Sequence, residues 1–144
     1  MEILSDKLLV RLLPEDLQPK KTIFHSTMDM LKKVEVIKKG DNTKWINEGD
    51  VVTLYVNSLY NIEDDLFFCV EREVILINDK PQPGKIHIKN PTKISMTALH
   101  EAEVVSSNDV ELIKGDTLIF KKGQSLVLPD HTEIISESQA FAKK

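Results

Sequence analysis

Apolar and polar residues alternate along most of this chain, in short runs rich in valine, isoleucine, leucine and aromatic residues. A period of two is typical of β-strands, and no run shows the period of a convincing amphipathic helix. The sequence therefore predicts an all-β protein. The predicted strands are residues 7–13, 34–38, 51–56, 66–70, 74–77, 85–89, 102–105, 117–121, 125–128 and 133–135.

The segment DKPQPG, residues 79–84, interrupts the series of predicted strands. Proline lacks the amide donor of a strand ladder and glycine accepts turn dihedrals, so this composition ends a strand. We expect a linker here, with one domain at 1–78 and a second, shorter domain at 79–144. A chain of 144 residues has room for one ordinary domain or two very small ones.

The same order of motifs occurs on both sides of this linker. The matched pairs are KLLVR and KIHIK at 7 and 85, VEVI and AEVV at 34 and 102, EGD and KGD at 48 and 114, and EVILI and EIIS at 73 and 133. The offset falls from 78 (7 to 85) to 60 (73 to 133) and changes only between strands, as differing loop lengths would cause. We therefore predict two versions of one small barrel. Chance repetition of apolar alternation is the alternative.

The charge and cysteine content exclude several classes of partner. The net charge is −4, which gives no basic surface for nucleic acid or an anionic membrane. The single cysteine, Cys69, forms no internal disulfide, and the N-terminus carries Glu2 and Asp6 where a signal peptide would be basic. No apolar stretch approaches the roughly 20 residues of a membrane helix. We expect a cytoplasmic location.

The sequence offers no constellation of residues for catalysis, and we predict neither an enzyme nor a bound cofactor or metal ion. Cys69 has apolar neighbours in LFFCVE and is predicted to be a buried, inert thiol. The histidines at 25, 87, 100 and 131 are scattered, and we expect them at surface or edge positions. The acidic cluster at 63–65 is predicted to be a solvated hairpin tip, with a cation site as the alternative.

The order of these motifs resembles that of the GroES-type co-chaperonins, and the resemblance covers nearly the whole chain. In that family a strand like KLLVR opens the barrel, a "G-E-V" strand follows a long loop, and motifs like KGDTLIF and EIISESQAFA close it. The resemblance implies two GroES-like β-barrels in tandem. It also implies a co-chaperonin that caps a nucleotide-bound chaperonin ring and assists protein folding. A structural or adaptor oligomer without chaperonin binding is the alternative, followed by a ligand-binding or enzymatic module on a related barrel.

The segment PEDLQPKKTIFHSTMDMLKK, residues 14–33, corresponds to the mobile loop of that family. In the family an apolar tripeptide of this loop docks on the chaperonin. The resemblance therefore assigns chaperonin binding to Thr22, Ile23, Phe24 and His25, although histidine departs from the usual aliphatic third residue. The alternative is that Ile23 and Phe24 pack on their own barrel.

The second half contains a shorter counterpart, NPTKISMTAL, at residues 90–99. Ile94 and Met96 would form a second docking tip there. Ser95 between them and the shorter reach favour an ordinary connection instead.

The family assembles as seven-membered rings in which each subunit gives its C-terminal strand to a neighbour. Residues 136–142 resemble that strand, whereas in the first half the linker follows EVILI directly. We therefore expect a homo-oligomer, heptameric by analogy, in which the second barrel of each chain builds the ring. The expected partner is a GroEL-type chaperonin.

Overall fold

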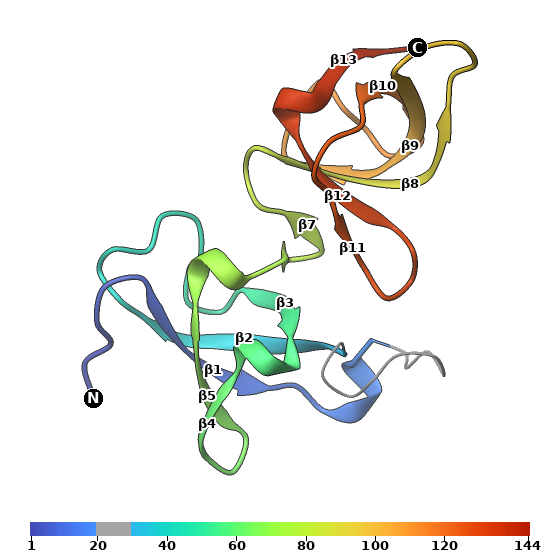
Figure 1. The fold of residues 1–144 in the computed structure, drawn as a ribbon. Helices are drawn as coiled ribbons and strands as arrows, with labels where there is room; N and C mark the ends of the chain where they lie inside the picture. The colour runs from blue at the N-terminus through green and yellow to red at the C-terminus, as the bar shows by residue number, and fades with distance from the viewer. Residues whose placement is uncertain (20–29) are drawn as a thin grey trace. The chain divides into compact units, whose positions relative to one another are not determined.

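A computed structural model describes residues 1–19 and 30–144 of the chain (Figure 1). Strands dominate it, and the all-β class predicted from the sequence is confirmed. In this described part, no helix has the length and apolarity needed to cross a membrane. The helices among the described residues are short 3-10 turns: η1 (Glu15–Leu17), η3 (Val56–Ser58), η4 (Glu71–Glu73) and η5 (Glu137–Gln139).

The chain divides into two compact units, Met1–Asp79 and Lys80–Lys144. The first unit is an antiparallel sheet in which neighbouring strands follow the order β4-β5-β1-β2-β3-β6. Its strands are β1 (Lys7–Leu12), β2 (Leu31–Lys39), β3 (Val51–Tyr55), β4 (Tyr60–Glu63), β5 (Leu66–Val70) and β6 (Leu76–Ile77).

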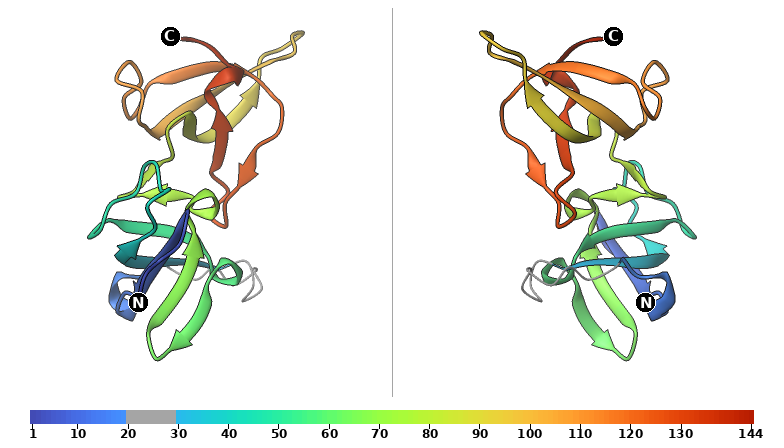
Figure 2. Two further views of the ribbon diagram at one scale, coloured as in Figure 1. Left: turned by 90° about the vertical axis from the view of Figure 1, so that its left-hand side faces the viewer. Right: turned by 90° about the vertical axis from the view of Figure 1, so that its right-hand side faces the viewer.

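The second unit contains a separate antiparallel sheet with the order β11-β12-β8-β9-β10-β13. Its strands are β8 (Lys85–Lys93), β9 (Leu99–Ser107), β10 (Thr117–Lys121), β11 (Leu126–Val127), β12 (Glu133–Ser136) and β13 (Ala140–Lys143). The short strand β7 (Lys80–Pro81) lies inside the predicted linker, where the sequence led us to expect none. Figure 2 shows the β8–β9 hairpin, in yellow, extending away from the rest of this unit.

The two units repeat one another strand by strand. If β1 to β6 are replaced by β8, β9, β10, β11, β12 and β13, the first strand order becomes the second. The pairing registers repeat as well. The equivalent pairs are Leu8↔Cys69 with Ile86↔Ile135, Val34↔Val52 with Ala102↔Leu118, and Thr53↔Leu76 with Ile119↔Ala142. The repeat predicted from the sequence is therefore a repeat of fold.

The Gly-Asp turn is the most closely matched feature of the two units. Gly49 and Gly115 have φ angles of 90° and 95°, a region that glycine adopts without the steric cost of a Cβ. The Asp50 carboxylate accepts a hydrogen bond from the amide of Asn47 at 2.8 Å, and Asp116 accepts one from Ile113 at 3.0 Å. The paired glycine and aspartate thus form the same turn before the third strand of each copy.

Each unit has its own apolar core, and the two cores use equivalent positions. In the first unit the buried cluster includes Leu8, Val10, Val36, Leu54 and Cys69. The corresponding residues Ile86, Ile88, Val104, Phe120 and Ile135 form the cluster of the second unit. Each fully buried aliphatic side chain contributes about 1.5–3 kcal/mol to stability. Each unit is therefore stabilised by a hydrophobic core of its own.

One of the four motif matches made from the sequence is wrong. EIIS belongs to β12, whose structural counterpart is β5, residues 66–70, and not EVILI at 73–77. The last two residues of EVILI form β6, which occupies the place that β13 has in the second unit. A 3-10 turn precedes both strands: η4 comes before β6, and η5 comes before β13. The C-terminal strand that the sequence analysis found missing from the first half is therefore present.

Candidate functional site

The predicted docking tip Thr22, Ile23, Phe24 and His25 lies outside the described residues. The structure does describe the two ends of the 14–33 segment. β1 ends at Leu12 and β2 begins at Leu31, and the amide of Leu13 donates to the Lys33 carbonyl at 3.2 Å. The segment therefore starts and finishes side by side on neighbouring strands.

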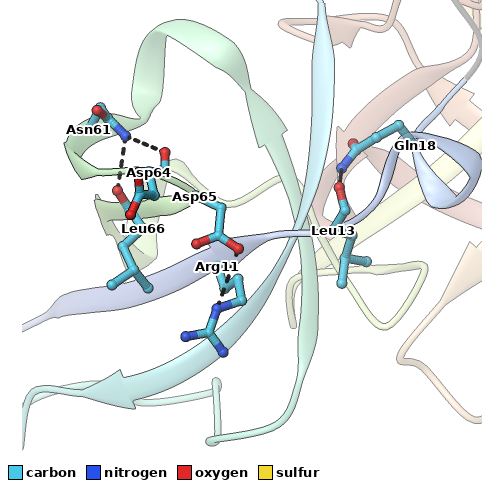
Figure 3. A network of polar contacts seen from close by, with 7 residues as sticks. All are labelled: Arg11, Leu13, Gln18, Asn61, Asp64, Asp65 and Leu66. Carbon is cyan, nitrogen blue, oxygen red and sulfur yellow. Dashed lines mark hydrogen bonds and ion pairs between the residues drawn. The ribbon is translucent and has the colours of Figure 1, made fainter.

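The Gln18 side chain joins these two ends. Its Nε2 donates to the carbonyls of Leu13 at 2.8 Å and of Lys33 at 2.9 Å, while its Oε1 accepts from the Lys33 amide at 2.7 Å (Figure 3 shows the contact with Leu13). The Lys33 ammonium also forms an ion pair of 2.9 Å with Asp79. The base of the segment is thus fixed by a polar network on the first unit.

The 90–99 segment, predicted to be a loop, is along half of its length a continuation of the strands of the β8–β9 hairpin. The ladder includes the pairs Thr92↔Glu101 and Lys93↔His100, and Asn90, with a φ of 54°, lies in an irregularity before them. Pro91 is tolerated there because a proline without an amide donor fits at a break in the ladder. Only residues 94–98 remain as the tip of the hairpin.

The two predicted docking residues of this tip differ in exposure. Met96 is 98% exposed, with a φ of 64°, whereas Ile94 is half-buried and its amide donates to the Leu99 carbonyl. The Thr97 hydroxyl donates to the Ile94 carbonyl at 2.9 Å and closes the turn. The structure therefore presents Met96, and not Ile94, as the apolar side chain at the end of the hairpin.

The acidic cluster at 63–65 lies at the turn between β4 and β5, with Glu63 ending β4 and Asp64 and Asp65 forming the turn, as the preferred interpretation of the sequence had it. The Asn61 amide donates to the carbonyls of Asp64 and Leu66, both at 3.1 Å, and Arg11 contacts Asp65 at 3.5 Å (Figure 3). Within residues 1–19 and 30–144, no group of three His, Cys, Asp or Glu side chains is arranged to hold a metal ion. These contacts describe an exposed hairpin tip.

Cys69 is a buried thiol, as predicted. Only 1% of it is exposed, and burial raises its pKa to about 12, with a smaller contribution from the negative charge of Glu73. A thiol must ionise to act as a nucleophile, so this residue is inert near neutral pH.

A cavity of about 380 Å³ lies next to Cys69 and is lined mainly by apolar side chains, among them Ile3, Leu4 and Phe68.

His87 was expected at a surface or edge position, and that prediction is wrong, because β8 lies between β12 and β9 in the sheet. It is only 7% exposed, and its Nε2 lies 2.7 Å from the hydroxyl of Thr132, which in turn donates to Asp130. His87 occupies the position of Leu9 in the repeat. Burial lowers its pKa, and the nearby Asp130 opposes that effect.

The lowered pKa of His87 predicts that acid destabilises the second unit. Between the ordinary histidine pKa of 6.5 and the lower folded value, the unfolded chain binds a proton that the folded chain does not. The free energy of unfolding should therefore fall as the pH decreases below about 6.5, and His87→Leu should flatten this dependence. Urea titrations from pH 5 to 8 measure it, with exposed His131→Gln as the control. An unchanged slope in His87→Leu would contradict the assignment.

Glu71 is a buried, hydrogen-bonded carboxylate that the sequence did not reveal. It is 4% exposed, and its carboxylate accepts hydrogen bonds from the backbone amides of Lys44, Trp45 and Ile46 at 2.8–3.1 Å. Its repeat counterpart, Glu137, is exposed. The role of Glu71 is structural, because it fixes the connection between β2 and β3.

The chain matches no protein-family model and no curated protein sequence.

Proposed function

We propose that this protein is a GroES-type co-chaperonin that caps a nucleotide-bound chaperonin ring and assists protein folding. The observation that carries the proposal is the repeat of fold. In both copies the candidate docking segment, 14–33 or 90–99, connects the first strand of the sheet to the second. The connection between the same two strands thus carries, in each of the two units, the apolar residues that the family resemblance assigns to chaperonin binding.

The exposure of Met96 supports this proposal. An apolar side chain that is 98% exposed at the tip of a hairpin makes no contribution to its own core. A thioether side chain is flexible and polarizable, and it adapts to an apolar groove on a partner. The tip is therefore suited to a weak contact that adds to the one proposed for Ile23 and Phe24.

The proposed mechanism uses several weak contacts in place of one strong contact. A contact made by one or two apolar side chains is weak, and this keeps each contact reversible. Several segments presented by one oligomer then raise the overall affinity. The hydrolysis of nucleotide belongs to the chaperonin, and this chain is proposed to bind none and to catalyse no reaction.

A second candidate function is that of a structural or adaptor oligomer without chaperonin binding. The second unit favours it through large apolar side chains that are exposed away from the hairpin tip: Val110 at 93%, Ile113 at 65% and Phe141 at 65%. Exposed apolar side chains mark a protein interaction site when they adjoin one another, and an adaptor would require that of these three residues.

Co-sedimentation with a purified GroEL-type chaperonin distinguishes the two functions. The proposed co-chaperonin should sediment with the ring in the presence of ATP and remain in the supernatant without it. An adaptor should remain in the supernatant in both cases. A small protein added at the same molar ratio and known not to bind chaperonins controls for trapping in the pellet.

Both halves of the chain carry the strand on which the expected assembly depends. The expectation that only the second barrel builds a ring rested on a C-terminal strand present in one half, and β6 and β13 show that both halves have one. Either unit is therefore a candidate for a place in the proposed ring. We retain the proposal of a heptamer in the cytoplasm, because it matches a seven-fold chaperonin.

The heptamer predicts a native mass near 115 kDa, from seven chains of 16.4 kDa. Native mass spectrometry at micromolar concentration measures it directly. A stable species of 16.4 kDa would exclude a ring. A mass corresponding to another number of chains would contradict the heptamer and give the oligomeric state in its place.

A further inference from the structure

The cavity beside Cys69 belongs to the first unit, where the N-terminal segment and the strands β4 and β5 contribute to its lining. Its volume of about 380 Å³ falls within the roughly 300–1,000 Å³ typical of small-molecule sites. The lining combines apolar side chains that are nearly buried, Ile3 and Val70 at 8%, with exposed ones, Leu4 at 68% and Tyr60 at 59%. The cavity is therefore open to solvent and offers apolar surface that a ligand can cover.

The N-terminal wall of the cavity is fixed to the rest of the unit by backbone contacts. The amide of Asn42 donates to the Ser5 carbonyl at 3.0 Å, and the amide of Glu71 donates to the Asp6 carbonyl at 3.0 Å. A Cβ at Gly40 would lie 2.1 Å from the Ser5 oxygen, so only glycine fits there without a shift of the backbone. The wall is therefore part of the folded unit, and the cavity exists before any ligand binds.

Tyr60 and Phe68 give the cavity its chemical character. They lie directly opposite each other on β4 and β5, so their side chains are neighbours on one face of the sheet. Aromatic rings pack favourably against another aromatic ring in edge-to-face or offset arrangements. In the second unit the equivalent pair is aliphatic, Leu126↔Ile134. The aromatic pair thus distinguishes the first unit from its own repeat.

The charged side chains of the lining disfavour a charged ligand. Glu2 and Lys7 have opposite signs, so a ligand of either charge would lie near one side chain of its own sign. The Lys7 ammonium is already paired with Asp6 at 2.7 Å. Water is a poor occupant as well, because an ordered water needs about two to four polar partners.

We propose that this cavity binds a small, uncharged aromatic molecule between the N-terminal segment and the aromatic pair Tyr60 and Phe68. The proposal is independent of chaperonin binding. The ligand ring contacts the aromatic pair and covers the exposed part of Leu4. The corresponding lining of the second unit is more polar. Gln82 stands for Leu4, since each carbonyl accepts from the amide three residues on, and Ser136 stands for Val70 in the register.

Isothermal titration calorimetry of the full chain with toluene tests the site. Toluene should bind saturably, with one molecule per chain. Methylcyclohexane, its saturated analogue, should bind several-fold more weakly, and benzoate, its charged analogue, should not bind. Absence of toluene binding, equal affinity for methylcyclohexane or equal affinity for benzoate would each overturn the proposal.

A substitution taken from the repeat locates the bound molecule. Leu4→Gln introduces the residue of the second unit at an exposed position, and it should weaken toluene binding about fivefold by removing apolar contact. Leu17→Gln is the matched control, because Leu17 is a 54% exposed leucine outside the lining. It should leave binding unchanged. Equal effects of the two substitutions would place the toluene elsewhere and overturn the proposal.

The aromatic pair is tested by a second graft from the repeat. The double variant Tyr60→Leu and Phe68→Ile copies the pair Leu126↔Ile134, and it should bind toluene and methylcyclohexane with equal affinity. A retained preference for toluene would contradict the assigned role of the pair. Toluene affinity that falls as the wild-type protein is concentrated would show that a second copy of the chain fills the cavity, which would overturn the proposal of a small-molecule site.

Discussion

Replacing Glu71 by alanine is expected to lower the free energy of unfolding of the first unit by about 3 kcal/mol. The carboxylate accepts hydrogen bonds from three consecutive backbone amides, those of Lys44, Trp45 and Ile46. Removal of a buried charged acceptor leaves these donors without a partner, and an unsatisfied buried donor costs about 1–3 kcal/mol. The loss should extend into the core, because Ile46 is only 1% exposed and belongs to its buried cluster.

The repeat supplies a matched control for this experiment. Glu137 occupies the same place in the 3-10 turn before the last strand of the second unit, but it is exposed. Glu137→Ala should therefore change stability by no more than about 0.5 kcal/mol. Urea unfolding followed by far-ultraviolet circular dichroism measures both units, and the fluorescence of Trp45, the single tryptophan, measures the first unit alone. Equal effects of the two substitutions would refute the role assigned to Glu71.

The same pair of residues shows why the sequence could not predict this contact. Glutamate is exposed by default, and both residues stand in a similar local pattern before a strand. What differs is the backbone that the fold brings against Glu71 from 25 to 27 positions away. Such a contact is set by tertiary structure, and local periodicity contains no information about it.

The strands themselves were predictable because alternation is a local signal. Six runs of apolar residues were placed within one residue of β1, β3, β5, β10, β11 and β12. β4 was missed because all four of its residues are exposed and it has no buried face to generate a pattern. β8 continues past Pro91 through an irregularity, where a proline ordinarily indicates the end of a strand.

Strand partners were harder to predict than strand positions. EVILI at 73 and EIIS at 133 share a glutamate followed by β-branched residues, so the sequence matched them. In the sheets, however, β12 pairs with β8 as β5 pairs with β1, through the registers Ile135↔Ile86 and Cys69↔Leu8. Pairing depends on residues far apart in the chain, and two strands of similar composition are interchangeable until those partners are known.

The docking residues are the part of the candidate site that rests most fully on sequence. Replacing both Ile23 and Phe24 by serine is expected to abolish ATP-dependent association with the chaperonin. Each apolar side chain contributes about 1.5–3 kcal/mol when fully covered by a partner. The loss is repeated at every subunit of an oligomer, and it therefore reduces the overall affinity far more than a single contact would.

The hairpin tip of the second unit provides a graded comparison. Met96→Ser should weaken association without abolishing it if both segments dock, because it removes one apolar side chain from the shorter connection. Leu126→Ser is the matched control, since Leu126 is an apolar residue that is 40% exposed on β11, outside both segments. It should leave association unchanged.

Circular dichroism and melting separate a docking role from a packing role. A docking tip predicts that the Ile23→Ser and Phe24→Ser double variant keeps the spectrum and melting temperature of the wild type while losing the chaperonin. A lower melting temperature would mean that these side chains pack on their own unit, which was the alternative raised by the sequence. Association equal to that of the wild type, with the fold intact, would exclude residues 22–25 as the contact and leave Met96 as the remaining candidate.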